Sequence, residues 1–279
     1  MTETTTIAAC RPGNLAVVTG GASGIGFAAA GAFLHLGMRV CLLDREGDAL
    51  AQAAERLGDG AMAFPVDIAD RARVEAVAAA IASSHGPVSL LMNNAGVGSG
   101  GDVFAAPEAW TQVLGVNLVG VLHGVQSFVP AMVANGAPGL VINTGSKQGI
   151  TQPPGNTAYN VSKAGVKALT EGLAHTLREQ TGGRVSAHLL IPGFTYTGMT
   201  AGRLAEKPPA AWTSDQVVDF MLRGIAAGDF YILCPDNETS TEQDRRRIRW
   251  AADDIAENRP ALSRWHPDWR EAFARHMAE

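Results

Sequence analysis

The fold is decided by the stretch Leu15-Ala16-Val17-Val18-Thr19-Gly20-Gly21-Ala22-Ser23-Gly24-Ile25-Gly26. Its apolar and β-branched start predicts a buried strand, its glycines predict a tight turn, and the apolar run at residues 27–36 predicts a helix. A strand, a glycine turn and a helix in this order place backbone N–H groups and a helix N-terminus where they can hold a pyrophosphate. Glycine permits the close approach of backbone to phosphate. A dinucleotide site is therefore favoured over the alternative, a structural βα turn that binds nothing.

A second strand is predicted at residues 39–44, and it ends in Asp44. This carboxylate stands 18 residues after Gly26, about where a Rossmann-type acid meets the adenosine ribose. A carboxylate there repels a 2′-phosphate, so Asp44 favours NAD over NADP. Arg45 argues the other way, since an arginine can bind that phosphate, but the glycine loop itself contains no Lys or Arg. Asp44 as a helix N-cap is an alternative compatible with either role.

The alternation of apolar runs and helical patterns continues along the chain. Further strands are predicted at residues 61–66, 88–92, 140–143, 185–191 and 230–233. Helices are predicted between them at 46–57, 72–83, 110–132 (broken by glycines and Pro130), 158–178 and 217–227. This pattern predicts an α/β fold, a doubly wound Rossmann-type parallel sheet in three αβα layers. We expect a single domain, with an N-terminal tail at 1–14, a core at 15–233 and a helical C-terminal extension at 234–279.

A tyrosine and a lysine, Tyr159 and Lys163, stand four residues apart on one predicted helix. This spacing places them on the same face, one turn from each other. Alone, such a pair is more often an exposed pair on an amphipathic helix. Here Ser146 precedes Tyr159 by 13 residues, at the end of a predicted strand. Ligands gather at the carboxyl ends of parallel strands, so we expect phenol, ammonium and hydroxyl to meet beside the dinucleotide.

Composition excludes several classes of function. The formal net charge of −5 argues against a nucleic-acid-binding protein. Three cysteines, Cys10, Cys41 and Cys234, fit neither a zinc spacing nor a disulfide framework, so a reducing cytoplasm is the expected location. The histidines show no ligand spacing, and no catalytic metal is expected. We find no signal peptide and no apolar run long enough to cross a membrane, so no membrane partner is expected.

These landmarks together resemble the short-chain dehydrogenase/reductase family in its compact, single-domain form. The glycine motif T-G-x-x-x-G-x-G, the N-N-A-G segment and the Y-x-x-x-K pair stand in the family's order between about residues 15 and 233. By this resemblance the catalytic residues are Asn117, Ser146, Tyr159 and Lys163. The cofactor-binding residues that the loop and the resemblance indicate are Gly20, Ser23, Gly24, Ile25, Gly26, Asp44, Arg45, Asp67, Ile68, Asn94, Ala95, Gly96, Tyr159, Lys163, Pro192, Gly193, Thr195 and Thr197.

The chemistry follows from the residue types. Tyrosine has a pKa of about 10 and is a poor base at neutral pH. A nearby cation favours the phenolate, and Lys163 together with an oxidised nicotinamide ring would supply that charge. Tyr159 is therefore the expected general base for alcohol oxidation and general acid for reduction, with Ser146 stabilising the reacting oxygen. By the family resemblance, Lys163 also holds the ribose hydroxyls and Asn117 fixes a water that links Lys163 to solvent.

Substrate contacts are expected between Ser146 and Tyr159 and in the segment after Gly193, which often forms a lid in the family. The predicted substrate-binding residues are Ser146, Gln148, Gln152, Tyr159, Phe194 and Tyr196, with Ile150, Pro153, Asn156 and Met199 as further candidates. These apolar, aromatic and amide groups favour a neutral or hydrophobic alcohol or ketone. Lys147 or Arg203 could instead bind a carboxylate. Many family members carry small or apolar residues directly after the catalytic serine, and the side chains of Lys147-Gln148 either enter the pocket or are solvated.

The extension after Leu233 is 46 residues long, whereas many family members end soon after this strand. Ile248, Ala252 and Ile255 fall at helical spacing and predict an amphipathic helix with a charged outer face. The arginine run at residues 245–249 suggests a nucleic-acid patch as an alternative, but acidic residues surround it.

Tryptophans are concentrated in the same extension. Three of the five, Trp250, Trp265 and Trp269, lie there. Exposed aromatic rings are common at interfaces. We therefore expect the extension to pack against the core or a neighbouring subunit. The family usually forms dimers or tetramers, so a homo-oligomer, and a homotetramer in particular, is expected.

The predicted function is an NAD(H)-dependent oxidoreductase that transfers a hydride between a secondary alcohol or ketone and nicotinamide. An alternative is a catalytically silent regulatory module that binds the dinucleotide, and the intact Ser146, Tyr159 and Lys163 argue against it. A sugar-nucleotide epimerase or dehydratase is less favoured. Those proteins usually have a differently spaced glycine loop and a larger C-terminal substrate domain.

Overall fold

A computed structural model describes residues 7–98, 100–198 and 206–278. Seven parallel strands form one sheet in the order β3-β2-β1-β4-β5-β6-β7, and the strand order reverses between β1 and β4. The strands are β1 (Leu15–Thr19), β2 (Arg39–Asp44), β3 (Ala61–Pro65), β4 (Val88–Asn93), β5 (Gly139–Thr144), β6 (Val185–Ile191) and β7 (Tyr231–Leu233). Each strand predicted from the sequence is present, within about one residue at either end.

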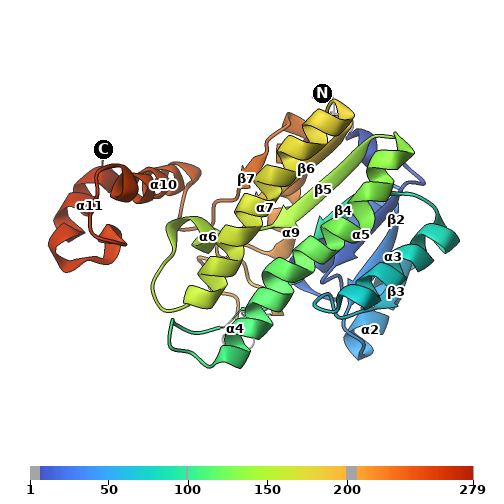
Figure 1. The fold of residues 1–279 in the computed structure, drawn as a ribbon, viewed down its shortest axis with the longest axis horizontal. Coiled ribbons are helices and arrows are strands. Elements are labelled where there is room, and N and C mark those ends of the chain that lie inside the picture. The colour runs from blue at the N-terminus through green and yellow to red at the C-terminus, as the bar shows by residue number, and fades with distance from the viewer. Residues whose placement is uncertain (1–6, 99, 199–205, 279) are drawn as a thin grey trace.

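Helices cover both faces of this sheet (Figure 1). One core cluster joins the sheet to α1 (Gly24–His35), α2 (Asp48–Leu57) and α9 (Ser214–Ala227). The opposite cluster joins it to α3 (Arg71–His85), α5 (Gly120–Asn135) and α7 (Thr157–Thr181). The remaining helical segments are η1 (Ala8–Cys10), α4 (Pro107–Leu114), η2 (Gly115–Val119), α6 (Gln148–Thr151), α10 (Thr241–Ala256), η3 (Ser263–Trp265), η4 (Pro267–Trp269) and α11 (Arg270–Ala278). The predicted doubly wound αβα fold is confirmed.

Strand β1 shows why the sheet needs helices on both sides. All five of its residues are buried. Ala16 and Val18 pack into the cluster with α1 and α9, whereas Val17 packs into the cluster with α3 and α5. Alternate side chains of a strand point to opposite faces, so a strand that is apolar throughout requires cover on each face. Thr19 is the polar end of the strand, and the candidate site begins there.

The helix predicted at 110–132 is longer and less regular than expected. Segments α4, η2 and α5 run on as one helix, Pro107–Asn135, and η2 is a π-helical turn. Pro130 does not break it: the residue is exposed, while the flanking Val129 and Met132 are buried and hold the helix on the core. This helix has 29 residues and a mean hydropathy of 1.4 in its most apolar window, so by length and composition it could cross a membrane, contrary to the expectation from sequence. Half of that window is buried and α5 packs on β4, as a core helix does.

The C-terminal extension forms an arm, residues 234–278. In Figure 1, α10 and α11 stand apart from the sheet, and α10 approaches the body at α6. Trp250 is 5% exposed and packs edge-on against Trp269 and Phe273. Its indole N–H donates to Ser263 Oγ at 2.7 Å. The arm therefore has a small aromatic core of its own. Helix α10 contacts the body mainly at α6, and Asn237, which precedes the helix, is hydrogen-bonded to Pro209, Ala210 and Ala211. Contact with a neighbouring subunit stays a prediction.

The apolar face predicted for α10 is wrong. Ile255 is 87% exposed and Ala252 is also exposed, whereas Asp244 and Trp250 are the buried residues of the helix. The large ring of Trp250 removes more apolar area from water than the smaller side chains, so it decides which face turns inward. Asp244 is turned inward by an ion pair with Lys147.

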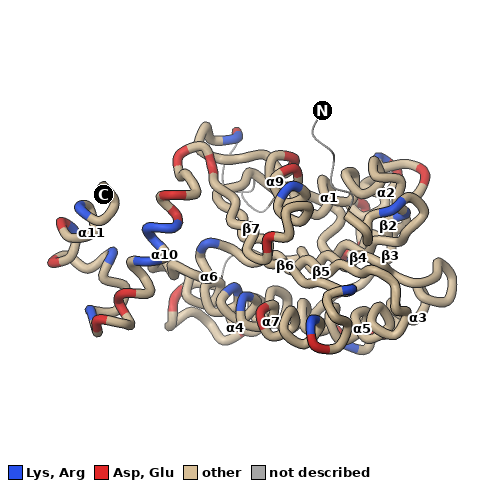
Figure 2. Tube along the Cα trace, turned by 90° about the horizontal axis from the view of Figure 1, so that it is seen from above, with Lys and Arg blue, Asp and Glu red and all other residues tan. Residues whose placement is uncertain are grey.

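The arginine run of α10 is not a uniform basic surface. Arg245, Arg246 and Arg249 all lie within 4 Å of the Glu242 carboxylate. Figure 2 shows both signs of charge interspersed along α10 and α11. A nucleic-acid site requires a stripe of one sign, so the arm gives the nucleic-acid alternative no support.

Candidate active site

The glycine loop has a shape that only glycine permits. Gly20 has φ of +65°, and a Cβ there would lie 2.7 Å from Ala95 Cα. A Cβ on Gly26 would collide with the Gly20 carbonyl oxygen and lie 2.7 Å from Asn94 Nδ2. These close approaches seat α1 directly on the end of β1. Ser23 is the N-cap of α1, but its side chain caps no N–H group, so the helix N-terminus fits an anion.

Asp44 ends β2 as predicted, and it braces the loop. Its Oδ2 accepts a hydrogen bond from the Ala22 N–H at 3.1 Å, and its Oδ1 accepts from the Arg45 N–H at 2.8 Å. The Asp44 carboxylate is half-buried, whereas the Arg45 side chain is exposed. The next helix has Gly47 as its N-cap, so the alternative of Asp44 as an N-cap is wrong. A fixed negative charge therefore stands at the strand end where the adenosine ribose is expected.

Hydrogen bonds tie the end of β4 to β1 and β5. Thr19 Oγ1 accepts from the backbone N–H groups of Asn94 (2.9 Å) and Ala95 (3.1 Å). Asn94 Oδ1 accepts in turn from Thr144 Oγ1 at 3.3 Å. The predicted Asn94–Gly96 segment therefore lies against the glycine loop. Neither Thr19 nor Thr144 was predicted to position it.

Asp67 and Ile68 follow β3 on the same edge of the sheet. Asp67 Oδ1 accepts from the Ala69 N–H at 2.9 Å, which shapes the turn. The Ile68 carbonyl oxygen is 2.9 Å from Nδ1 of the buried His123 on α5. His123 thus holds the turn that carries the two predicted cofactor residues.

Ser146, Tyr159 and Lys163 come together as predicted. The Ser146 hydroxyl lies close enough to the Tyr159 phenol to lower its pKa, and Lys163 Nζ lies 5.8 Å from the centre of the Tyr159 ring. Lys163 is 4% exposed and donates to the Thr144 carbonyl oxygen at 2.8 Å. Gly149 allows α6 to cross α7 closely, because a Cβ there would lie 2.5 Å from the Lys163 carbonyl carbon. The alternative of an exposed Tyr–Lys pair is wrong.

Burial dominates the electrostatics of this group. Burial raises the pKa of Tyr159 above its usual value, and the hydrogen bond with Ser146 partly opposes that rise. Burial also lowers the pKa of Lys163 to about 8. At neutral pH Lys163 therefore keeps its proton, and Tyr159 is a phenol beside a cation. The phenol of Tyr159 can give its proton to a substrate oxygen. When further positive charge nearby favours the phenolate, Tyr159 can instead take a proton from the substrate.

Asn117 is fully buried in the π-helical turn, and its amide has partners that the resemblance did not imply. Oδ1 accepts from the Val97 N–H at 2.7 Å, and Nδ2 donates to the Val97 carbonyl at 2.9 Å. This pair of bonds pins the chain that follows Gly96. A Cβ on Gly96 would lie 3.3 Å from Asn117 Oδ1 and 3.8 Å from Lys163 Nζ, so Asn117 stands near the ammonium. Its role in holding a water stays a prediction.

The segment after β6, which starts with Pro192 and Gly193, folds over the glycine loop. Thr195 forms a parallel bridge with Trp212, and the Tyr196 N–H donates to the Trp212 carbonyl at 2.9 Å. A Cβ on Gly24 would lie 3.2 Å from Thr197 Cβ. Thr197 thus contacts the loop predicted to hold the pyrophosphate, as its predicted cofactor role requires.

The predicted substrate residues near Ser146 lie on short, surface-facing elements. Gln148 and Ile150 are on α6, and Gln152 ends this helix with φ of 49°. Phe194, which opens the segment after Gly193, is 37% exposed. Met199 and Arg203 lie outside the described residues.

Two other candidates are engaged elsewhere. The amide of Asn156 donates to the Gly98 carbonyl at 2.9 Å and accepts from the Gly100 N–H at 3.2 Å. Asn156 thus ties the loop after β4 to the start of α7, and its amide is not available to a substrate. Lys147 is neither solvated nor an open cation, because it forms ion pairs with Asp236 and Asp244.

Sequence reasoning missed these two aspartates as the partners of Lys147. They stand 89 and 97 residues after Lys147, so no local spacing links them to the site. The only available signal was Lys147 itself, a cation in a position where the family commonly has a small side chain.

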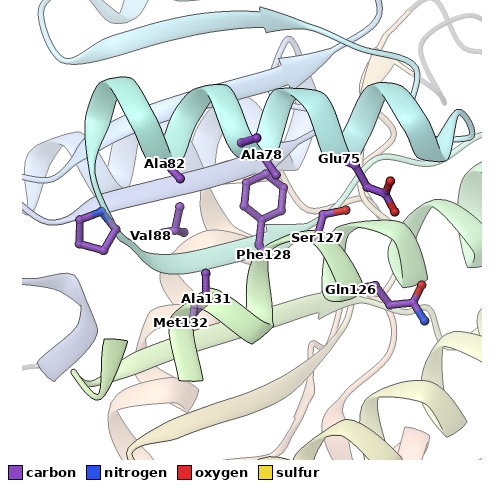
Figure 3. A pocket seen from close by; sticks show the side chains of 11 residues that line it. Glu75, Ala78, Ala82, Val88, Gln126, Ser127, Phe128, Ala131 and Met132 are labelled. Carbon is purple, nitrogen blue, oxygen red and sulfur yellow. The ribbon is translucent and has the colours of Figure 1, made fainter. Parts of the chain in front are cut away.

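A groove of about 360 Å³ lies between α3 and α5, at the start of β4 and away from the carboxyl ends of the strands (Figure 3). Small and apolar side chains such as Ala78, Ala82 and Phe128 line most of it. Its one carboxylate, Glu75, pairs with the exposed Arg71 at 2.7 Å. Its one hydroxyl, Ser127, forms no hydrogen bond with Glu75, and the described ranges contain no cluster of three metal ligands. The strand ends, rather than the groove, are therefore the candidate site.

Comparisons with known proteins agree with this geometry. The sequence model of the family described as short chain dehydrogenase matches residues 14–208. Over 199 residues the chain is 39% identical to galactitol 2-dehydrogenase (L-tagatose-forming) of Cereibacter sphaeroides, which covers 70% of this chain and 76% of that protein. Over 272 residues it is 37% identical to granaticin polyketide synthase putative ketoacyl reductase 1 of Streptomyces violaceoruber, which covers 87% and 96%.

Solved structures give the same answer. A short chain dehydrogenase/reductase from Burkholderia phymatum in complex with NAD has a TM-score of 0.80 and 34% identity, covering 89% of this chain and 96% of that one. A metagenomic short-chain oxidoreductase in complex with NADP has a TM-score of 0.67 and 29% identity, covering 81% and 98%. The chain belongs to the short-chain dehydrogenase/reductase family. It is an oxidoreductase of a family that binds nicotinamide dinucleotides.

Proposed function

We propose that this oxidoreductase transfers a hydride between a secondary alcohol, or the corresponding ketone, and NAD(H). The observation that carries the proposal is the buried group of Tyr159, Ser146 and Lys163 beside the glycine loop. A structural helix has no reason to bury an ammonium and a phenol together, because burial opposes the charge on each. Proton transfer between Tyr159 and a substrate oxygen explains why these two groups are buried together.

Tyr159 exchanges the proton with the substrate oxygen. Its phenolate takes the proton of an alcohol that is being oxidised, and its phenol returns a proton to a ketone that is being reduced. The Ser146 hydroxyl donates a hydrogen bond to the same oxygen and stabilises the charge that develops there. Lys163 keeps its proton at pH values below its pKa of about 8, and this positive charge favours the phenolate of Tyr159. A nicotinamide dinucleotide, when bound, supplies the hydride acceptor or donor.

The residues present fit this cofactor. The N-terminus of α1 has no side-chain cap and faces a loop built of glycines, which suits the pyrophosphate. Asp44 is proposed to bind the adenosine ribose, Lys163 the nicotinamide ribose, and Thr195 and Thr197 the carboxamide. The Asp44 carboxylate supports NAD over NADP, because it repels a 2′-phosphate.

A neutral or hydrophobic alcohol or ketone is the proposed substrate. Lys147, the nearest candidate for a carboxylate clamp, has its charge balanced by Asp236 and Asp244. Phe194 and the amide of Gln148 leave the predicted substrate side apolar and uncharged. The names of the two relatives above point to a polyol and a ketoacyl compound, and both contain the proposed functional group.

The substitution Tyr159→Phe tests the function. Purified protein is titrated with NADH, then assayed with galactitol, simple secondary alcohols and β-ketoacyl esters by nicotinamide absorbance. We expect kcat to fall by roughly 10²- to 10⁴-fold, since one proton-transfer group is removed, while the Kd for NADH stays within about threefold. Turnover retained in Tyr159→Phe would contradict the mechanism. NADH binding by a wild-type chain that converts no alcohol or ketone would favour the regulatory module instead.

We also propose that the protein is a cytoplasmic dimer or tetramer. Trp265 and Trp269 are only partly covered by the arm, which supports a further contact there. All three cysteines are buried and free, which suits a reducing compartment. Light scattering coupled to size exclusion tests the oligomer, and a monomeric mass at micromolar concentration would contradict it.

A further inference from the structure

Lys147, directly after Ser146, is held in a cluster of four charged residues. Its Nζ lies 2.5 Å from Asp244 Oδ2 and 3.3 Å from Asp236 Oδ2. The side chain of Lys147 is 17% exposed, that of Asp244 is 5% exposed and that of Asp236 is 9% exposed. Arg247 Nη1 is 3.6 Å from the other oxygen of Asp244, so two cations and two anions balance. Ion pairs that are this buried are costly to break, unlike exposed pairs.

Asp236 connects this cluster to the second loop of the site. Its Oδ2 also accepts from the Phe194 N–H at 3.3 Å. A Cβ on Gly193 would lie 2.8 Å from both Lys147 Nζ and Asp236 Oδ2, so the cluster packs directly on Gly193. The loop after β5, which carries Ser146, and the loop after β6 therefore meet at one ion pair.

Asp244 connects the cluster to the C-terminal arm. It lies on α10, which packs so closely against α6 that only about 10 Å³ remains in a void bounded by Lys147, Asp244 and Ile248. Among the described residues, Asp244 Oδ2 has no polar partner besides the Lys147 ammonium. Burial raises the pKa of Asp244, and Lys147 opposes that rise. Asp244 is therefore paired with Lys147 of the body and with Arg247 of α10 itself, and Lys147 is the one partner that joins it to the body.

The cluster therefore restrains Lys147 rather than presenting it to a ligand. Its ammonium is already shared by two carboxylates, so it offers no free cation to a substrate acid. Its backbone is one peptide away from Ser146, whose hydroxyl accepts from the Gln148 N–H at 3.2 Å and lies beside the Tyr159 phenol. Fixing Lys147 fixes the chain on which Ser146 stands.

We propose that Lys147, held by Asp236 and Asp244, is a positioning residue that keeps the Ser146 hydroxyl against Tyr159. The C-terminal arm is thereby part of the active-site scaffold. This inference rests on the proposed function and deepens it. The family match ends at residue 208, so both aspartates lie in the part of this chain beyond the match.

Two variants of the full-length protein test the inference, Lys147→Met and Asp244→Ala. Lys147→Met leaves two buried carboxylates without their cation and can fail to fold, and Asp244→Ala covers that case. For each variant we measure the melting temperature, the Kd for NADH by fluorescence, and kcat and KM for the alcohol that the wild type oxidises fastest. We expect kcat to fall about 10- to 100-fold, as when one transition-state hydrogen bond is weakened, with NADH affinity unchanged within about threefold. Lys147→Arg, which keeps the charge, should recover most of kcat.

The pH profile of kcat separates positioning from a general electrostatic effect. Removal of the Asp244 anion alone would make the phenolate of Tyr159 easier to form, so the kinetic pKa would fall. Loss of the hydrogen bond from Ser146 has the opposite sign, and we expect the kinetic pKa to rise in Asp244→Ala. The matched control is Lys167→Met, which removes an exposed ion pair with Glu171 on α7 and should leave kcat and pH profile unchanged.

Three results would overturn the inference: wild-type kcat in both variants, a kinetic pKa that stays or falls in Asp244→Ala, or a loss of NADH affinity that matches the loss of kcat. The last result would mean that the cluster serves the cofactor segment after β6 instead. Failure of the proposed function looks different, because then Tyr159→Phe keeps turnover or the wild type has none. In that second case the inference falls with the function, since Ser146 has no reaction to serve.

Discussion

Lys163 is an ammonium in a place where burial opposes its charge. Its pKa of about 8 lies below the usual 10.5, so the folded chain binds this proton less tightly than the unfolded chain does. Between pH 8 and 10.5 the unfolded state holds more protons, and the free energy of unfolding rises as the pH rises through this window. Below pH 8 Lys163 is protonated in both states, so the folded state bears the full cost of burying the charge. This cost lowers the free energy of unfolding by about 3 kcal/mol. A residue kept at such a cost is kept for chemistry.

Lys163→Met should therefore raise stability while it abolishes activity. The apolar side chain removes the desolvation cost but loses the hydrogen bond to the Thr144 carbonyl, worth about 1 kcal/mol, and leaves that oxygen without its donor. We expect a net gain of roughly 1–2 kcal/mol in the free energy of unfolding at pH 7, measured by urea denaturation. The gain should shrink as the pH rises from 8 to 10.5 and be gone above pH 10.5, where the wild-type lysine is neutral in both states. Lys167→Met is the matched control, and an equal gain there would contradict the argument.

Asp44 determines the cofactor preference, if its carboxylate repels the 2′-phosphate of NADP. Asp44→Asn removes the charge and keeps one oxygen for the Ala22 N–H, while the exposed Arg45 N–H loses its acceptor to solvent. We expect the ratio of Kd values for NADPH and NADH to fall about tenfold, equivalent to about 1.4 kcal/mol, by fluorescence titration. Arg45→Ala is the companion variant. A wild-type chain that prefers NADPH, and loses this preference in Arg45→Ala, would show that the arginine outweighs the aspartate.

The glycine loop and α1 form one βα element, and two of its glycines allow a matched comparison. A Cβ on Gly26 would strike the Gly20 carbonyl, whereas a Cβ on Gly31 would meet only Leu57 Cδ2, at an ordinary 3.5 Å. Gly26→Ala should lower the free energy of unfolding by about 1–3 kcal/mol and displace the loop, so that NADH binding falls below detection. Gly31→Ala should stabilise α1 by roughly 0.5–1 kcal/mol and leave binding unchanged. Equal behaviour of the two variants would mean that the loop can move apart without loss.

The elements of the sheet were predictable because their signals are local. β1, β2 and β6 match the predicted bounds, since a buried parallel strand is an uninterrupted apolar run between turns. The break predicted at Pro130 was wrong for a tertiary reason: the buried side of α5 holds the helix through the proline. On α10 the spacing of Ile248 and Ile255 predicted the wrong buried face, because the ring of Trp250 is buried instead. In both helices the outcome depended on which residues pack against the helix, and the spacing of apolar residues along the sequence does not show this.

The candidate site divides in the same way. Ser146, Tyr159 and Lys163 were predictable because fixed spacings on one strand end and one helix bring them together. Asp236 and Asp244 were not, because they reach Lys147 only after β7 and α10 are in place. The use of Asn156 as a loop tether was missed for the same reason, since its partners Gly98 and Gly100 lie on a different loop.

At the scale of the whole molecule, a sheet-based body and an aromatic arm meet at one buried ion cluster. The body's core runs along the whole sheet, whereas the helices α10 and α11 pack around Trp250 and reach the body mainly at α6. Units with so few shared contacts can open separately, at a lower free energy than global unfolding. The three cysteines stand where this can be measured. Cys41 lies inside β2, Cys10 lies in η1, and Cys234 follows the edge strand β7 where the arm begins. Cys10 and Cys234 are both buried in the core cluster of the body.

Thiol labelling should then distinguish local from global opening. Burial raises the pKa of Cys10 to about 11, and that of Cys41 and Cys234 to about 12, so at pH 8 the native thiols are almost wholly protonated and inert. Each thiol reacts with iodoacetamide only when its surroundings open. We expect mass spectrometry to show Cys234 labelled about tenfold faster than Cys41, because Cys234 follows the edge strand β7 and leaves the core when the arm and the end of this strand open together. Asp244→Ala should accelerate Cys234 alone, because it loosens the arm and not β2. If both cysteines react at one rate in both proteins, the arm and the body unfold as one cooperative unit. The cluster would then be one contact among many rather than the joint between two parts.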